Sequence, residues 1–189
     1  MRIIAGTYRG LRLRTLKGAG LRPTSDHLRE TLFNILGGSV HGSRFLDAYA
    51  GSGAVGIEAL SRGASDVVFL EHHRPAAAII RENLNALGLR GGFQVIARPV
   101  WSALERLERE GNQFEIVFLD PPYDEVGEYH RSLRILARSR LLLPDSQVIA
   151  EHARQCKLEE HYGGLHRTRL IRHGDSQLAF YRKAAGDEL

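Results

Sequence analysis

From residue 45 onward, short apolar runs alternate with longer stretches in which apolar residues recur at helical spacing. The apolar runs, which are typical of buried strands, lie at 45–48, 67–71, 93–97, 114–119 and 147–151. The helical stretches lie at 54–62, 75–87, 101–110 and 128–137. Repeated strand–helix units of this kind predict an α/β fold with a mostly parallel sheet and helices on both faces. Ligands of such sheets bind beyond the carboxyl ends of the strands.

The two ends of the chain follow a different pattern. Residues 2–5 and 11–14 lie on either side of a turn bounded by glycines, and they predict a two-stranded ribbon. Leucine alternates with arginine in the second segment, as Leu11, Arg12, Leu13 and Arg14. This alternation predicts one basic face, with the leucines opposite. Near the C-terminus, residues 167–172 and 177–181 flank a short polar turn and predict an antiparallel hairpin.

One further helix is predicted between the ribbon and the first apolar run. Residues 23–26, Pro-Thr-Ser-Asp, are of the types that begin helices. An apolar face at helical spacing follows, made by Leu28, Leu32, Phe33, Ile35 and Leu36. Gly37 and Gly38 then predict the end of the helix.

Length and composition place the chain among single-domain proteins. Its 189 residues are enough for one domain with a small appendage. The single cysteine, Cys156, allows no disulfide within the chain. The sequence contains no apolar run near the roughly 20 residues that cross a bilayer, and its first residues lack the apolar segment of a signal peptide. We therefore expect a cytoplasmic protein with no membrane partner.

Positive charge is concentrated at the N-terminus. Residues 1–44 contain eight basic and two acidic residues, whereas the remaining residues contain 18 basic and 20 acidic ones. A basic arm on a near-neutral body favours a polyanion partner over a merely solvated basic surface. The arginines and the lysine expected to contact that partner are Arg2, Arg9, Arg12, Arg14, Lys17 and Arg22.

A glycine-rich loop follows the first apolar run. Its glycines have the spacing Gly51-x-Gly53-x-x-Gly56, and Glu71 stands at the end of the next predicted strand. This spacing matches the fingerprint of dinucleotide-binding proteins. A dinucleotide, however, would bring its pyrophosphate to the helix N-terminus beside Asp47, which is an unfavourable contact between like charges.

S-adenosylmethionine fits the same loop better than a dinucleotide does. It carries an ammonium and a sulfonium, and the carboxylate of Asp47 attracts both. The glycines allow close approach of the backbone to either ligand, and Glu71 can accept hydrogen bonds from ribose hydroxyls. The loop therefore favours a methyl donor over a dinucleotide, with a structural turn that binds no ligand as the third interpretation.

The second candidate loop is Asp120-Pro121-Pro122-Tyr123, which follows the apolar run at 114–119. Two prolines stiffen this loop and remove two backbone donors, so the Asp120 carboxylate and the Pro121 carbonyl are expected to be its exposed acceptors. Two acceptors that bind the hydrogens of an exocyclic amine can direct its lone pair at a methyl group, in which case catalysis needs mainly orientation. Tyr123 offers a ring on which an unpaired base can stack. The alternative is a proline-rich turn with no chemical role.

These motifs together resemble the RsmD-type methyltransferases, which modify the N2 amine of a guanine in small-subunit ribosomal RNA. The resemblance covers nearly the whole chain, and its most specific part is Arg22 to Asn34. Its other parts are residues 2–6 with Arg9-Gly10, residues 47–53, residues 58–63, residues 120–123 and Tyr181.

The resemblance implies a Rossmann-like, seven-stranded class I methyltransferase sheet with a small RNA-binding ribbon. The domain boundaries expected on this basis are 1–20 for the ribbon and 21–189 for the methyltransferase domain. The expected residues at the S-adenosylmethionine site are Thr24, Asp47, Gly51, Ser52, Gly53, Glu71, His72 and Val100. Asp120, Pro121, Pro122 and Tyr123 are expected to hold the guanine. The implied substrate is small-subunit ribosomal RNA within an assembling ribosomal particle.

Two positions depart from the family pattern. His73 stands where the family usually has Asp or Asn after Glu71, and Arg98-Pro99-Val100 replaces an Asp or Asn that faces the adenine. We expect the backbone near Val100 to serve the adenine instead. The adjacent histidines His72 and His73 point apart on most backbones, and no acidic or cysteine cluster accompanies them, so no metal site is expected.

Two other functions fit part of the same evidence. An adenine-N6 methyltransferase acting on DNA or RNA uses the same tetrapeptide as residues 120–123, but it usually carries a separate target-recognition domain. A dinucleotide-binding module without methyl transfer would explain the glycine spacing alone.

Overall fold

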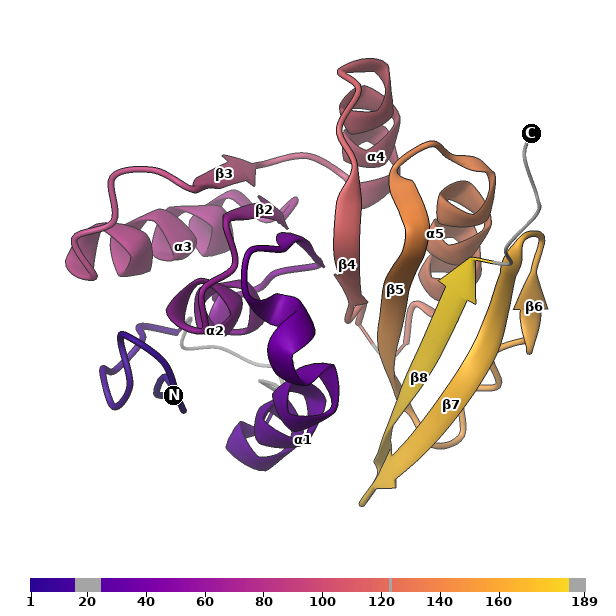
Figure 1. Ribbon diagram of the computed structural model, residues 1–189, viewed down its shortest axis with the longest axis horizontal. Helices are drawn as coiled ribbons and strands as arrows, with labels where there is room; N and C mark the ends of the chain where they lie inside the picture. The colour runs from indigo at the N-terminus through magenta and orange to yellow at the C-terminus, as the bar shows by residue number, and fades with distance from the viewer. Residues whose placement is uncertain (16–24, 123, 184–189) are drawn as a thin grey trace. The chain divides into compact units, whose positions relative to one another are not determined.

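The computed structural model describes residues 1–15, 25–122 and 124–183 (Figure 1). The chain forms two compact units, Met1–Pro99 and Val100–Leu189. The domain boundary predicted between residues 20 and 21 lies outside the described residues and stays a prediction.

The first unit contains a parallel sheet of three strands, in the order β3-β2-β1. The strands are β1 (Arg44–Ala48), β2 (Asp66–Leu70) and β3 (Phe93–Ile96), and the connecting helices are α2 (Ala54–Ser61) and α3 (Arg74–Ala86). The last residues of β1, β2 and β3 lie in register with one another, as the pairs Ala48 with Leu70 and Leu70 with Ile96. The loops that follow β1 and β2 therefore begin side by side, at the edge where ligands of parallel sheets bind.

Helix α1 (Asp26–Leu36) begins and ends where the sequence predicts. The Ser25 hydroxyl accepts a hydrogen bond from the Leu28 N–H at 3.1 Å and caps the first turn. Gly37 ends the helix with a φ of 53°, and a short 3-10 turn, η1 (Gly37–Val40), follows. The apolar face predicted for this helix is buried at Leu28, Leu32, Phe33 and Leu36.

The N-terminal segment forms the predicted antiparallel ribbon, with Arg2 paired to Arg12. The Ile3 N–H donates to the Leu11 carbonyl at 3.0 Å, and the Gly10 N–H donates to the Ile3 carbonyl at 2.9 Å. The two leucines predicted opposite the basic face differ in their burial. Leu13 is 7% exposed but Leu11 is 48% exposed. The Leu11 N–H bonds the Tyr8 carbonyl within the turn, so Leu11 does not follow the alternation of a regular strand.

The second unit contains five strands in the order β4-β5-β8-β7-β6. Its elements are α4 (Val100–Arg109), β4 (Phe114–Leu119), α5 (Val126–Arg138), β5 (Leu142–Ala153), β6 (His161–Tyr162), β7 (Leu165–His173) and β8 (Ser176–Lys183). β4 and β5 are parallel, whereas the later pairs are antiparallel. Figure 1 shows β7 and β8 as two long neighbouring strands, which form the predicted C-terminal hairpin.

Two features of this unit differ from the predicted strands. β5 begins at Leu142 rather than at residue 147, because an irregular stretch is built into it. Asp145 has a φ of 68° there, and the Ser146 hydroxyl bonds the Phe114 carbonyl at 2.7 Å, beside a shift in the register of β4 with β5. β6 has only two residues, too few to show an alternating pattern, and it is the additional strand beyond the seven predicted.

The cores of both units are apolar and closely covered. Every residue of β2 except the first is buried, as is every residue of β4 except Glu115. In the described part of the chain, no helix is both long and apolar enough to cross a membrane.

Candidate functional site

Asp47, near the end of β1, is a buried carboxylate in the first unit. It is 2% exposed, and its Oδ2 accepts a hydrogen bond of 2.8 Å from the N–H of Gly56 in α2. Burial raises the pKa of Asp47 to about 7; the nearby Glu71 also raises it, and the bond from Gly56 opposes the rise. A positive ligand beside Asp47 would stabilise its ionised form.

Glu71, directly after β2, connects two loops of the first unit. Its Oε2 accepts a hydrogen bond from the Gly51 N–H at 2.8 Å, and its Oε1 accepts one from the His73 N–H at 2.8 Å. The residue is 6% exposed. Each carboxylate oxygen accepts one backbone bond and has further acceptor capacity, so Glu71 can hold the loop backbone and still accept bonds from a ligand.

The loop after β1 adopts a backbone that favours glycine. Gly51 and Gly53 have φ values of 55° and 78°, a conformation that L side chains rarely adopt. Tyr49 has a φ of 65°, although it is not glycine. A bulky residue in this region is an outlier that costs roughly 1–3 kcal/mol and occurs mostly at functional sites. The loop is therefore held in a strained conformation by its surroundings.

Asp120 and Pro121 follow β4 in the second unit. Asp120 is half-buried, Pro121 is buried and Pro122 is exposed. The Pro121 carbonyl accepts a hydrogen bond of 3.1 Å from the Tyr129 hydroxyl. The expectation of an exposed Pro121 carbonyl is therefore wrong, because the residue is buried and its carbonyl is already bonded within the protein. A carbonyl oxygen has a second lone pair with which it can accept a further bond.

Tyr129 of α5 holds the loop at residues 120–122 through its bond to the Pro121 carbonyl. Its side chain is fully buried, and its ring meets the ring of His152 edge-on, with centroids 6.3 Å apart. Burial lowers the pKa of His152, so this histidine is neutral at pH 7. The Pro122 carbonyl is also engaged, by the Glu125 N–H at 2.9 Å. These bonds and the two prolines make the backbone of residues 120–122 stiff.

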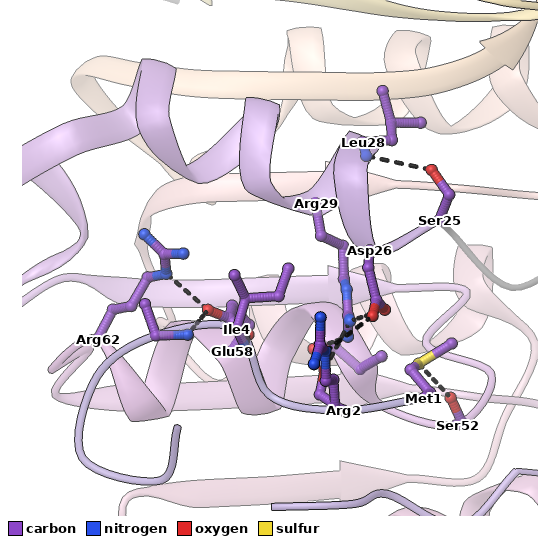
Figure 2. Close-up of polar contacts among 12 residues, drawn as sticks. Met1, Arg2, Ile4, Ser25, Asp26, Leu28, Arg29, Ser52, Glu58 and Arg62 are labelled. Carbon is purple, nitrogen blue, oxygen red and sulfur yellow. Dashed lines mark hydrogen bonds and ion pairs between the residues drawn. The ribbon is translucent and has the colours of Figure 1, made fainter. Parts of the chain in front are cut away.

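The ribbon is attached to α2 through a buried carboxylate. Figure 2 shows Glu58, which is fully buried, accepting a bond from the Ile4 N–H at 2.8 Å. The Ala5 N–H donates to the same carboxylate at 3.0 Å, and Arg62 pairs with it at 2.7 Å. Gly6 lies so close to this helix that a Cβ there would overlap the carbonyl of Ser61. The first strand of the ribbon is thus attached to α2.

A comparison with known proteins now identifies the family. The family described as Conserved hypothetical protein 95 matches residues 1–182. YlbH of Bacillus subtilis is 36% identical over 183 residues, which span 97% of this chain and 99% of YlbH. A Haemophilus influenzae protein named Ribosomal RNA small subunit methyltransferase D is 39% identical over 153 residues, which span 80% of this chain and 78% of that protein. The chain belongs to this family.

The family is the RsmD family predicted from the sequence, and the predicted class I methyltransferase fold is confirmed with it. The solved structure of yhhF from Escherichia coli superposes with a TM-score of 0.83 at 31% identity, covering 98% of each chain.

The donor-site residues predicted for an RsmD-family protein fall into four groups. Five of them lie on the two neighbouring loops of the first unit or at the strand end before them, namely Asp47, Gly51, Ser52, Gly53 and Glu71. His72 lies beside them with an exposed side chain, its Nδ1 3.7 Å from Oε1 of Glu71. Val100 begins α4 in the second unit and is buried, and Thr24 lies outside the described residues.

The predicted RNA contacts differ in their surroundings. Arg2 pairs with Asp26 at 3.5 Å, and Arg14 pairs with Glu82 at 2.8 Å, in each case on the surface. Arg9 and Arg12 are exposed and form no ion pair with another described residue. Lys17 and Arg22 lie outside the described residues, as does Tyr123 of the second loop.

Sequence reasoning gave no role to four residues that shape these sites. Tyr129 supports the second loop, and Glu58, Asn83 and Arg29 fasten the ribbon. Glu58 carries a usable signal, because it is the only charged residue in the otherwise apolar and small stretch 54–61. In the described part of the chain, no group of three or more acidic, histidine or cysteine side chains is arranged to hold a metal ion.

Proposed function

We propose that this protein is an S-adenosylmethionine-dependent methyltransferase that acts on the exocyclic N2 of a guanine in small-subunit ribosomal RNA. Membership of the RsmD family supports the enzyme class and the RNA substrate, because relatives in that family carry the name Ribosomal RNA small subunit methyltransferase D. The observation that carries the donor assignment is the pair of buried carboxylates, Asp47 and Glu71, around the glycine loop.

These carboxylates suit a cationic ligand. Asp47 is buried near Glu71, and this neighbour raises its pKa further. An ammonium or sulfonium group placed there would relieve the repulsion, whereas the pyrophosphate of a dinucleotide would increase it. Glu71 would accept bonds from the ribose hydroxyls through its remaining acceptor positions. When bound, S-adenosylmethionine supplies a methyl group on a positively charged sulfur, which leaves with the bonding electron pair as a neutral thioether.

The second loop is suited to orient the acceptor amine. Asp120 and the Pro121 carbonyl would accept hydrogen bonds from the two hydrogens of guanine N2. Methyl transfer forms a new bond from N2 to carbon, and one N2 hydrogen leaves as a proton, which the Asp120 carboxylate accepts. The bond from Tyr129 holds the Pro121 carbonyl in one orientation, so the loop needs little reorganisation during the reaction. We assign base stacking to Tyr123.

The ribbon supplies the RNA contact in this proposal. Arg9 and Arg12 are exposed and carry no ion pair among the described residues, so they are open to phosphates. Arg2, Arg14, Lys17 and Arg22 complete the predicted basic set. An assembling small ribosomal subunit, rather than naked RNA, is the proposed substrate, and the cytoplasm is the proposed compartment.

The test is a methylation assay with S-adenosylmethionine carrying a labelled methyl group and small ribosomal subunits from cells that lack this protein. Nucleoside analysis of the product should show N2-methylguanosine. A product that contains N6-methyladenosine instead would show that the target base is adenine and not guanine. A thermal-shift comparison should show stabilisation by S-adenosylhomocysteine and none by NAD, because ligand binding stabilises the folded state by mass action. Stabilisation by NAD alone would overturn the donor assignment.

A further inference from the structure

We propose that Asn83 is a positioning residue that joins the ribbon to the loop after β1, so that binding of RNA and binding of the methyl donor strengthen each other. The proposal rests on the proposed function, because it takes the ribbon as the RNA contact and the loop as part of the donor site. It concerns the first unit alone, which contains both elements.

Asn83 bonds both elements at once. It lies on α3 and is 3% exposed. Its Oδ1 accepts the N–H of Arg14 at 2.8 Å, and its Nδ2 donates to the Arg14 carbonyl at 3.0 Å and to the Ser52 carbonyl at 3.1 Å. One buried amide therefore pairs with the backbone of the second ribbon strand and with the backbone of the donor loop.

The orientation of the Asn83 amide follows from these partners. Its neighbours are one N–H and two carbonyls. Only an amide that turns its oxygen to the N–H and its NH₂ to the two carbonyls satisfies all three. The opposite orientation would place like groups together in a site that water barely reaches, at a cost comparable to that of unsatisfied buried polar groups.

Two further contacts join the same elements at the first ribbon strand. Figure 2 shows the Ser52 hydroxyl directed at the sulfur of Met1, at 3.8 Å. It also shows the fully buried Arg29, whose Nη2 donates to the Arg2 carbonyl and to Asp26, each at 2.7 Å. Nη1 of Arg29 is 3.5 Å from the Ala54 carbonyl, at the start of α2 directly after the glycine loop. Both ribbon strands are thus connected to the donor loop or its end.

These connections predict positive cooperativity between RNA binding and donor binding. The donor must bind the loop in one backbone conformation, and that conformation is strained at Tyr49. The Asn83 amide restrains the Ser52 carbonyl only while its other bonds, to Arg14, hold it in place. RNA bound to the ribbon restrains Arg14 and, through the Asn83 amide, the Ser52 carbonyl. The loop then loses less conformational entropy when the donor binds. By linkage, the donor must strengthen RNA binding by the same factor.

The test measures the affinity of S-adenosylhomocysteine with and without saturating small ribosomal subunits from cells lacking the protein. In the unchanged protein, the subunits should lower the dissociation constant by about fivefold or more, within the usual range for coupled sites. Asn83→Ala should reduce this factor to less than about twofold. Asn83→Ser serves as a second variant should the first fold poorly, because its hydroxyl is too short to span from Arg14 to Ser52.

Asn85→Ala is the matched control, since Asn85 is the same residue type on the same helix but is exposed. It should keep the full coupling factor. A protein in which both ligands bind independently, or an Asn83→Ala variant that keeps the full factor, would overturn the coupling and leave the proposed function standing. An unchanged protein that binds neither ligand would overturn both.

Discussion

The substitution Asp47→Asn isolates the charge on which the donor assignment depends. Asparagine has nearly the same shape and can still accept the 2.8 Å bond from the Gly56 N–H, but it cannot ionise. Asp47 is 2% exposed, and burial raises its pKa from 3.8 to about 7 in the folded protein. The folded state therefore holds this proton at pH values where the unfolded state has lost it.

The stability effect has a defined sign and size. Because the pKa is raised on folding, the contribution of Asp47 to stability is fully present below pH 3.8 and is lost as the pH rises to about 7. A shift of one pKa unit corresponds to about 1.4 kcal/mol, so the total loss is about 4 kcal/mol. Roughly 3 kcal/mol of this falls between pH 5 and pH 8. Asp47→Asn cannot ionise and does not lose this contribution. From pH 5 to pH 8, its free energy of unfolding should therefore rise by roughly 3 kcal/mol relative to that of the unchanged protein.

Urea unfolding of both proteins at several pH values between 5 and 8 measures the difference directly. A difference that stays constant with pH would refute the reasoning, because it would mean that Asp47 does not change its ionisation on folding. The same experiment extends to the donor. The ammonium group of S-adenosylhomocysteine favours ionised Asp47, so this ligand should bind the unchanged protein more tightly as the pH rises toward and through 7. Asp47→Asn should bind it more weakly and lose this pH dependence.

Three further experiments test the second loop and the ribbon. Asp120→Ala should lower turnover by about a hundredfold or more, the usual effect of losing an acid–base group, while calorimetry finds donor affinity within a few fold. Tyr129→Phe should lower turnover at saturating RNA by about tenfold, because the Pro121 carbonyl loses its support. Tyr181→Phe is the control, because it removes another buried hydroxyl that donates to a backbone carbonyl in the same unit. It should lose a similar free energy of unfolding, about 1 kcal/mol, and keep its turnover. An equal loss of turnover in both variants would mean that Tyr129 has only a structural role. Changing Arg9 and Arg12 together to Ala should weaken RNA binding and reduce the slope of log affinity against log salt by about 2; an unchanged slope in a filter-binding series would exclude the ribbon as the RNA contact.

The sequence predicted the elements whose periodicity is regular. The strand that contains Asp47 and the strands that precede Glu71 and Asp120 are short apolar runs. A parallel sheet brings the ends of neighbouring strands to one edge. This regularity is why the sequence alone predicts a ligand site beyond the carboxyl ends of the strands. β5 begins five residues before the apolar run at 147–151, because it includes an irregular stretch around Asp145 that has no regular apolar pattern.

The tertiary hydrogen bonds could not be predicted in the same way. Nothing in the spacing of Asn83, Arg14 and Ser52 indicates that one amide bonds the backbones of the other two, because the partners are separated by 69 and 31 positions in the chain. Backbone partners also leave no residue-type signal in the sequence. Tyr129 is similar, since its hydroxyl meets a proline carbonyl eight residues away and its helix pattern shows only that it is buried. Glu58 is the exception, because a carboxylate in an apolar helix must find buried donors.

The most direct test of the central claim is mass spectrometry of small-subunit ribosomal RNA from cells with and without the protein. The account predicts that one guanine loses its N2-methyl group in the deficient cells, that the unchanged gene restores it, and that the Asp120→Ala variant does not. Loss of an N6-methyladenosine, or methylation identical in both strains, would contradict it.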